Sequence, residues 1–411
     1  MTKSQANKLG KSLRRNLNAN EVPTSECLNN LQEYRTSFKD DVSSVFEKLA
    51  ILAKETRKDS ISSFRIKRIE SILSKIKREP TMALGNMGDI AGCRVLLYSE
   101  FALKKLIEKI HLQFDVKYVN DYLENSKEDG YRGYHIYIYS PNNNSRLIEI
   151  QLRTIESHKW ASMVEIIDIL FNLKIKEGQT HKEFERFHLL FANKKNLSLN
   201  EKKELIKIDI KHNIHSKLNE VFIKNHLKIW NEWINLNKKE DSNYFIIEVD
   251  ENKTSNIISF DSYEIAESSY FTKFKESKNS HFVLTKIEKS NFKRICIAYA
   301  SYVLIKHDYL EDWTLITNDI IDDLIEKKER EELIFFSKHI YRNMGEQIEL
   351  IESELQEIKD YQNNEGFDYN AWTEWLQELG ARLQRIKEIY KGETAKNERT
   401  KNFLYKIFGG Q

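Results

Sequence analysis

The stretch 130–158 constrains the fold most strongly, because two short alternating runs surround a turn-forming cluster. Residues 135–139 read His-Ile-Tyr-Ile-Tyr, and residues 147–152 read Leu-Ile-Glu-Ile-Gln-Leu. Between them lies Pro-Asn-Asn-Asn-Ser at 141–145. β-Branched and aromatic residues favour strands, whereas Pro, Asn and Ser favour turns, so this stretch predicts a β-hairpin.

The second strand of this hairpin separates polar from apolar side chains. Alternation places Glu149, Gln151 and Arg153 on one face. The opposite face carries Ile148, Ile150 and Leu152. A carboxylate, an amide and a guanidinium side by side could form a functional surface, although a solvated outer face is the commoner case for such a pattern. The pattern by itself leaves both interpretations open.

Composition places the chain among water-soluble globular proteins of two or three domains. It has 411 residues, 40% hydrophobic and 31% charged, with a formal net charge of +2. No apolar run reaches the length of a membrane span, and the N-terminus lacks the apolar core of a signal peptide. Cys27, Cys93 and Cys296 have no paired spacing, which argues against a zinc site and fits a reducing cytoplasm.

Periodicity predicts an α+β domain over residues 24–195. Apolar residues at three- and four-residue steps predict one helix over 25–57, capped by Thr24 or Ser25. Further elements are predicted in the order strand, helix, strand, helix, strand, hairpin and helix. Their ranges before the hairpin are 62–67, 69–77, 89–98, 101–111 and 114–119.

Two basic clusters precede the hairpin. Residues 1–23 form a basic N-terminal arm, interpreted either as a solubilising tail or as a binder of phosphate backbones; its cations include Lys8, Lys11, Arg14 and Arg15. The second cluster gathers Arg65, Lys67, Ser71 and Lys75, a density that suits a polyphosphate although a solvated helix face is the commoner case. Asp89 precedes a predicted strand, where a metal-binding carboxylate could sit.

Several motifs occur in one register. They are Arg65-Ile66-Lys67, Ser71-Ile72, Lys75, the run 89–94 (Asp-Ile-Ala-Gly-Cys-Arg), Asp121-Tyr122, Lys127, the run 130–135 (Gly-Tyr-Arg-Gly-Tyr-His), the run 149–154 (Glu-Ile-Gln-Leu-Arg-Thr), His158 and Trp160-Ala161. In this order they resemble the RelA/SpoT-type nucleotide pyrophosphokinases over about residues 25–195. The resemblance implies a mixed-sheet, nucleotidyltransferase-like fold and Mg²⁺-dependent transfer of pyrophosphate from ATP to a ribose 3′-hydroxyl.

The resemblance also implies a role for each matching residue. Asp89 and Glu149 would bind Mg²⁺, and Glu149 would lie nearest the acceptor hydroxyl. ATP would be held by Arg65, Lys67, Ser71, Lys75 and Arg94, with the two arginines stacking on adenine. The acceptor would contact Tyr131, His135 and Lys127. Gln151, Arg153 and His158 would support these residues.

Departures from the family pattern bear on the acceptor. Many alarmone-making members carry Lys before Asp-Tyr and Pro before the later Lys, whereas this chain has Asn120 and Ser126. Together with the basic arm, this resembles a toxic branch that modifies the 3′-CCA end of tRNA. A guanosine or adenosine nucleotide as acceptor, giving alarmones such as guanosine tetraphosphate, is the alternative. A non-catalytic nucleotide sensor is the alternative of another class.

The C-terminal half predicts three further parts: connecting helices over 196–241, a small α/β module over 242–317, and a helical region over 318–411. The module contains predicted strands at 244–249, 257–260 and 281–284, and predicted helices at 263–274 and 291–304. In the helical region, steps of three and four over 332–360 and 371–390 predict an antiparallel hairpin.

Tyr299 and Tyr302 lie in the small module at helical spacing. Packing is the usual fate of such a pair. The layout also resembles fused toxin–antitoxin members of this enzyme class, in which a Tyr-x-x-Tyr element covers the nucleotide pocket and a phage structural protein releases it. The resemblance therefore implies autoinhibition and phage defence.

Overall fold

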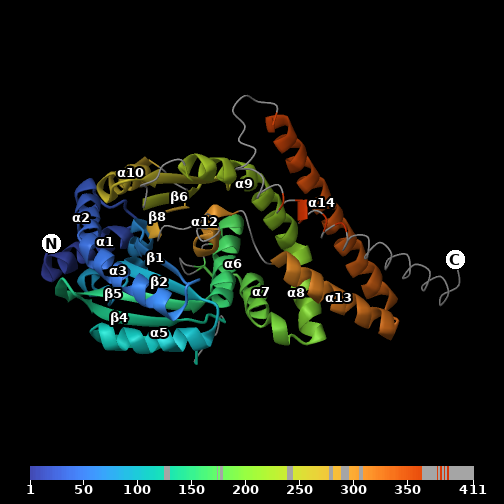
Figure 1. The fold of residues 1–411 in the computed structure, drawn as a ribbon, viewed down its shortest axis with the longest axis horizontal. Helices are drawn as coiled ribbons and strands as arrows, with labels where there is room; N and C mark the ends of the chain where they lie inside the picture. The colour runs from blue at the N-terminus through green and yellow to red at the C-terminus, as the bar shows by residue number, and fades with distance from the viewer. Residues whose placement is uncertain are drawn as a thin grey trace. The chain divides into compact units, whose positions relative to one another are not determined.

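The structure of the chain is a computed structural model (Figure 1). It describes residues 1–124, 130–173, 175, 179–237, 244–276, 281–287, 296–304 and 309–362, with single positions at 377, 380, 381, 384 and 387. The chain divides into two compact units. The first comprises 1–181 and 235–303, and the second comprises 182–234 and 304–411.

The first unit is built on an eight-stranded sheet of order β3-β4-β5-β2-β1-β8-β6-β7 (Figure 1). The strands are β1 (Ile61–Ile66), β2 (Ala91–Leu97), β3 (Val116–Asp121), β4 (Tyr134–Ser140), β5 (Asn143–Thr154), β6 (Tyr244–Val249), β7 (Ser255–Phe260) and β8 (His281–Ile287). Strands β2 and β5 are parallel, and the other neighbours are antiparallel. The predicted α+β class with a mixed sheet and the hairpin of β4 and β5 are confirmed.

The two faces of this sheet differ in polarity, as alternation predicts. One face is apolar and packs against helices α3 (Lys39–Thr56) and α5 (Glu100–Gln113). Phe64, Cys93 and Ile150 are fully or almost fully buried there. The residues between them, such as Arg65, Arg94 and Gln151, point to the opposite face, because successive side chains alternate. That second face carries the polar pocket described below.

The helix predicted over 25–57 is in fact two helices, α2 (Ser25–Thr36) and α3. Thr24 caps α2 as expected, accepting a hydrogen bond from Cys27 N. The chain turns at Ser37 and Phe38, where the Ser37 hydroxyl donates to Tyr34 O at 2.8 Å. Such a side-chain bond competes with helix propagation, and the buried Phe38 ring packs edge-on against Tyr34.

The basic arm is an ordered helix, α1 (Lys3–Asn18), rather than a frayed tail. Apolar residues such as Leu9 and Leu13 pack against the fold, so tertiary contacts stabilise the helix. Arg14 donates to three carbonyls at the C-terminal end of α4 (Ile69–Arg78): that of Ile76 in its last turn at 3.0 Å, and those of Glu79 at 3.3 Å and Met82 at 2.5 Å just beyond it. Arg14 therefore serves the fold, whereas Lys8, Lys11 and Arg15 are exposed.

Strands β6, β7 and β8, which the structure describes within 244–287, do not form a sheet of their own. Strand β8 pairs with β1 in antiparallel register, with Arg65 opposite Thr285, and β6 and β7 follow it. Helix α10 (Tyr263–Glu276) covers these strands. The strands expected in the module over 242–317 thus continue the main sheet, and β8 covers the edge of β1 that would otherwise be unpaired, whereas residues 309–317 belong to a helix of the second unit. Helix α12 (Ala300–Val303) follows; positions 291–295 of the expected helix lie outside the described residues.

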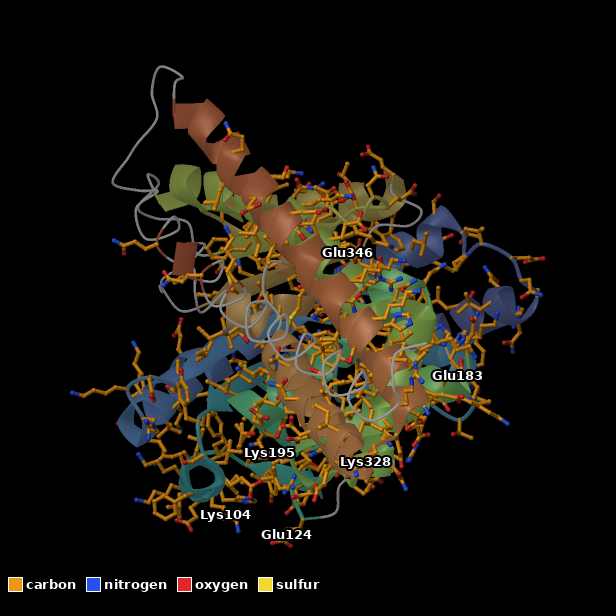
Figure 2. The ribbon with its side chains drawn as sticks, turned by 90° about the vertical axis from the view of Figure 1, so that its right-hand side faces the viewer. Lys104, Glu124, Glu183, Lys195, Lys328 and Glu346 are labelled. Atoms are coloured by element: carbon orange, nitrogen blue, oxygen red, sulfur yellow. The ribbon has the colours of Figure 1, made fainter. Side chains whose placement is uncertain are left out.

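The second unit is helical in its described part. Its helices are α7 (Lys182–Ala192), α8 (Leu199–His212), most of α9 (Ile214–Asn237), α13 (Tyr309–Lys327) and α14 (Arg330–Gln362). The single helix expected over 201–236 is split into α8 and α9 at Asn213, whose φ of 53° ends the first helix. Two glutamates labelled in Figure 2 make contacts within this unit: Glu183 forms an ion pair with Lys211, and Glu346 accepts a hydrogen bond from Ser216.

Helix α14 confirms the first half of the predicted C-terminal hairpin. The second half, 371–390, lies mostly outside the described residues. Among the helices that the structure describes, none has the length and apolar character needed to cross a membrane.

Candidate active site

A pocket of about 240 Å³ opens on the polar face of the sheet. It is lined by Ser63, Phe64, Arg65, Lys67, Asp89, Gly92, Cys93, Arg94, Asn120, Tyr122, His135, Tyr137, Glu149, Gln151 and Tyr299. Most of these residues come from β1, β2, β4 and β5 or from the segments at their ends. Residues more than 80 positions apart in the sequence therefore share one cavity.

Strand register explains this convergence. Arg94 on β2 is opposite Gln151 on β5, which is opposite His135 on β4. One step along the strands, Gly92 is opposite Glu149, which is opposite Tyr137. These are two transverse rows on one face, because residues two apart on a strand point the same way.

Gly92 lies directly beside Glu149 on the neighbouring strand, where the two backbones approach closely. A Cβ at this position would lie 3.1 Å from the Glu149 carbonyl oxygen and 3.7 Å from its Oε2. A side chain there would therefore press against the Glu149 backbone carbonyl and only touch the carboxylate. The absence of one leaves space between Arg65 on β1 and Glu149 on β5.

Asp89 is paired with two lysines. Its Oδ2 lies 2.8 Å from Lys67 Nζ, and both carboxylate oxygens lie 3.1 Å from Lys75 Nζ. Burial would raise the pKa of Asp89, but Lys67 and Lys75 outweigh burial and hold the pKa below its ordinary value. Burial likewise lowers the pKa of Lys67, against the opposing effect of Asp89. Asp89 is therefore an ionised carboxylate at neutral pH.

Glu149 is almost fully buried and accepts three hydrogen bonds. His135 Nδ1 lies 3.0 Å and Tyr137 OH 2.7 Å from Oε1, and Gln151 Nε2 lies 2.9 Å from Oε2. Burial would raise the pKa of Glu149, but the bonds from His135 and Tyr137 prevail and lower it to about 2. The pocket thus holds two ionised carboxylates, Asp89 and Glu149.

A series of hydrogen bonds runs from Arg153 through Tyr131 and His135 to Glu149. Arg153 Nε donates to Tyr131 OH at 3.1 Å, and Tyr131 OH lies 2.5 Å from His135 Nε2. If Tyr131 in turn donates to Nε2, Nδ1 carries the proton that binds Glu149. Tyr131, which the sequence resemblance placed against an acceptor base, is not among the residues that line this pocket, and its hydroxyl contacts His135 instead.

Arg94 is a half-buried guanidinium on β2 that borders the pocket. It donates to Gln151 Oε1 at 3.3 Å, while its Nε has no hydrogen-bond partner among the described residues. Burial, together with Arg153 and Arg65, lowers the pKa of Arg94 to about 10. A pocket wall with excess positive charge suits an anion or an electron-rich ring.

His158 lies behind Arg94 on helix α6 (Ile155–Phe171). Its Nε2 donates to Ile297 O at 2.9 Å. Burial, with Arg94 and Arg153 nearby, lowers the pKa of His158 well below its ordinary value, so the ring is neutral at neutral pH. His158 therefore ties α6 to the segment that carries Tyr299.

The remaining predicted residues are distributed around the pocket. Ser71 is half-buried on α4 and is not among the lining residues, and Lys127 lies outside the described residues. Tyr299 lines the pocket, and its hydroxyl is hydrogen-bonded to Thr285. Tyr302 is not in the lining; its ring lies 5.8 Å from the Arg68 guanidinium.

Sequence reasoning missed Tyr137 as a site residue. It is two positions after His135 on a predicted strand, so alternation could have placed it on the same face. Its bond to Glu149 depends on the β4–β5 register, which the turn alone did not specify.

Comparison with known proteins is consistent with this geometry. The family model described as "Region found in RelA / SpoT proteins" matches residues 64–170, which span the strands and segments around the pocket. The chain contains a RelA/SpoT domain. GTP pyrophosphokinase YjbM of Bacillus subtilis is 30% identical over 122 residues, which are 28% of this chain and 58% of that protein. GTP pyrophosphokinase YwaC of the same organism is 32% identical over 111 residues, 24% of this chain and 53% of that protein.

Solved structures similar to the RelA/SpoT domain include small alarmone synthetase 1 of Bacillus subtilis bound to its product pppGpp. It is 21% identical, with a TM-score of 0.36, covering 40% of this chain and 90% of that one. A GTP pyrophosphokinase family protein of Streptococcus pneumoniae is 24% identical, with a TM-score of 0.34, covering 44% and 95%. The chain spans 58% and 53% of the length of the two curated relatives named above.

The hydrogen bond from Tyr137 to Glu149 generates a testable prediction. Tyr137→Phe removes one of the donors that keep Glu149 ionised, so the pKa of Glu149 should rise from about 2 toward its ordinary value. Carboxyl ¹³C NMR titration, with Glu149→Gln to assign the signal, measures this shift. Tyr139→Phe on the same strand is the matched control and should leave the titration unchanged. An unmoved Glu149 titration in Tyr137→Phe would contradict the assigned bond.

Proposed function

We propose that the chain transfers pyrophosphate from ATP to a ribose 3′-hydroxyl. The observation that carries this proposal is the pair of ionised carboxylates, Asp89 and Glu149, facing a pocket that also presents Lys67, Arg65 and Arg94. Phosphoryl chemistry depends mainly on positioning and on stabilising charge, and these groups supply both. The RelA/SpoT match over the same residues supports the reaction class.

The two carboxylates fit Mg²⁺. This ion prefers oxygen ligands and is commonly held by one or two carboxylates, with water and substrate phosphates completing its shell. Among the described residues no group of three or more metal-ligating side chains gathers, so substrate oxygens would complete the set. When bound, the ion would neutralise charge on the phosphates. Lys67 and Lys75, which now balance Asp89, would then be available to the phosphate oxygens.

Glu149 has a defined part in this proposal. With a pKa of about 2 it is a weak proton acceptor, since general bases work best near the ambient pH. Its part is to hold the ion and to orient the acceptor hydroxyl, while His135 and Tyr137 keep it ionised. Arg65 and Arg94 border the same cavity and would stack on the adenine ring of ATP.

The reaction is tested with γ-labelled ATP and a panel of acceptors: tRNA, GDP, GTP, ADP and ATP. We expect label on one acceptor together with release of AMP, and a loss of at least about 100-fold in Glu149→Gln. Tyr139→Phe is the folded control. ATP binding without AMP or labelled product would instead support the nucleotide sensor.

For the acceptor, we propose the 3′ end of tRNA. Lys8, Lys11 and Arg15 are exposed along α1, and seven residues span about two helical turns, so they share one side of the helix. Asn120 lines the pocket at a position where a lysine would favour a free diphosphate. The names of the curated relatives favour a guanosine nucleotide instead, which is the second candidate.

The exposed cations of α1 lead to a testable prediction about the acceptor. Replacing Lys8, Lys11 and Arg15 by Glu should weaken tRNA labelling at least about tenfold and flatten its salt dependence, because phosphate contacts release counterions. Affinity for ATP should stay unchanged. Arg14 is left intact because it holds carbonyls of the fold. Efficient labelling of GDP with tRNA untouched would replace tRNA by the guanosine nucleotide.

We further propose that Tyr299 restrains the enzyme in cis, as part of a translation-blocking toxin that a phage structural protein releases. Tyr299 is almost fully buried and borders the same cavity as Arg65 and Arg94. Its ring would compete with adenine for the guanidinium groups. Release requires only that the activator bind the open state better than the closed one.

Point variants test this restraint better than truncation, because β8 is hydrogen-bonded to β1. Tyr299→Ala should raise ATP turnover several-fold and slow the growth of expressing cells, and Glu149→Gln should cancel both effects. Tyr302→Ala, outside the pocket lining, should have the smaller effect. Unchanged turnover in Tyr299→Ala, at matched soluble protein, would leave this tyrosine only a packing role.

A further inference from the structure

A buried ion pair joins α2 to α10, far apart in the sequence and outside the RelA/SpoT match. Arg35 Nη1 lies 2.9 Å from Glu267 Oε1, and their side chains are 0% and 5% exposed. Gln32 binds both partners, accepting from Arg35 at 2.7 Å and donating to Glu267 at 2.6 Å. The cluster is therefore closed to solvent and made of side chains from two helices.

The same arginine holds the backbone of a pocket residue. Arg35 Nε donates to Lys67 O at 2.8 Å. The Lys67 N–H donates to Ile90 O at 2.7 Å, next to Asp89, and Lys67 Nζ binds Asp89 itself. Both backbone polar groups of Lys67 are thus fixed, one toward the Asp89 segment and one toward Arg35.

Tyr270, one turn after Glu267 on α10, completes the brace. The Arg35 guanidinium lies 4.6 Å from the centre of its ring, and its hydroxyl accepts from Ile69 N at 3.4 Å. The backbone on both sides of Arg68 is therefore contacted by this cluster. Lys67 and the first turn of α4 are held together.

Stability alone does not explain this arrangement. Burying two charges costs desolvation, and well-packed neutral residues often serve a fold equally well. The Arg35 Nη2 atom also has no hydrogen-bond partner among the described residues. A donor aimed at the Lys67 carbonyl is what the arginine adds, and an apolar residue could not supply it.

We propose that Arg35 and Glu267 are positioning residues that set Lys67 for the phosphates of the nucleotide. This inference rests on the proposed function. It makes residues 263–276 part of the active-site support, although they lie almost 100 positions beyond the RelA/SpoT region. The C-terminal part of the first unit then contributes to nucleotide binding as well as to any restraint.

The test uses the full chain with the double substitution Arg35→Met/Glu267→Gln. It removes both buried charges and keeps a partner for Gln32, so thermal melting should stay near that of the wild type. The KM for ATP should rise at least about tenfold with the KM for the acceptor unchanged, since small displacements of a binding group are costly. Arg35→Lys, which keeps the charge but not the planar set of donors, should behave like the double variant.

The matched control is Lys39→Gln/Glu264→Gln. This pair also joins α10 to the N-terminal helices, one turn before Glu267, but it is more exposed and is not bonded to Lys67. It should leave both KM values unchanged. If the first double variant does not fold, Glu267→Gln alone, which keeps the side-chain shape, takes its place.

Hydrogen exchange of the Lys67 and Ile69 amides gives a readout that does not require turnover. Faster exchange there in Arg35→Met/Glu267→Gln, with peptides from β4 and β5 unchanged, would support the brace. Wild-type exchange and wild-type KM for ATP in a folded double variant would overturn it. If the wild type transfers no pyrophosphate, the proposed function fails, while exchange and binding of a fluorescent ATP analogue still decide the role of Arg35.

Discussion

The pairing of β2 with β5 is the constraint on which the rest of the site depends. These are the parallel strands of the sheet, and their register puts Gly92 beside Glu149 and Arg94 beside Gln151. A slip of one residue would turn Glu149 into the apolar core and Ile150 into the pocket. The apolar face packed under α3 and α5 makes such a slip costly, so core packing and site geometry are specified together.

Charge balance is the second requirement of this face. Asp89 and Glu149 are kept ionised by different means: two ammonium groups for the first, and hydrogen bonds from a histidine, a tyrosine and a glutamine for the second. Buried carboxylates would otherwise take up protons. The guanidinium groups on the neighbouring strands supply the opposite charge. The result is a polar surface that is prepared for a highly charged ligand.

The C-terminal part of the first unit belongs to the same sheet as the strands that form the pocket. Strand β8 covers the edge of β1, while α10 reaches the Lys67 backbone through Arg35. The segment 296–303 contacts α6 through His158 and through the bond from Ser301 to Glu165. A region that the sequence presents as a separate module is therefore continuous with the RelA/SpoT domain in structure.

Local pattern in the sequence was enough to predict the hairpin, the polar face of β5, the strands β1, β2, β6 and the helices α4, α5 and α10. Alternation and helical periodicity depend only on near neighbours, so they are readable without a fold. The grouping of Arg65, Asp89 and Glu149 came from a resemblance of motifs. Tertiary structure alone decided the break at Ser37, the pairing of β8 with β1, the use of Arg14 within the fold and the Arg35–Glu267 brace. Each of these features depends either on contacts between residues distant in the chain or on competition for a backbone carbonyl. Neither kind of interaction leaves a periodic pattern in the sequence.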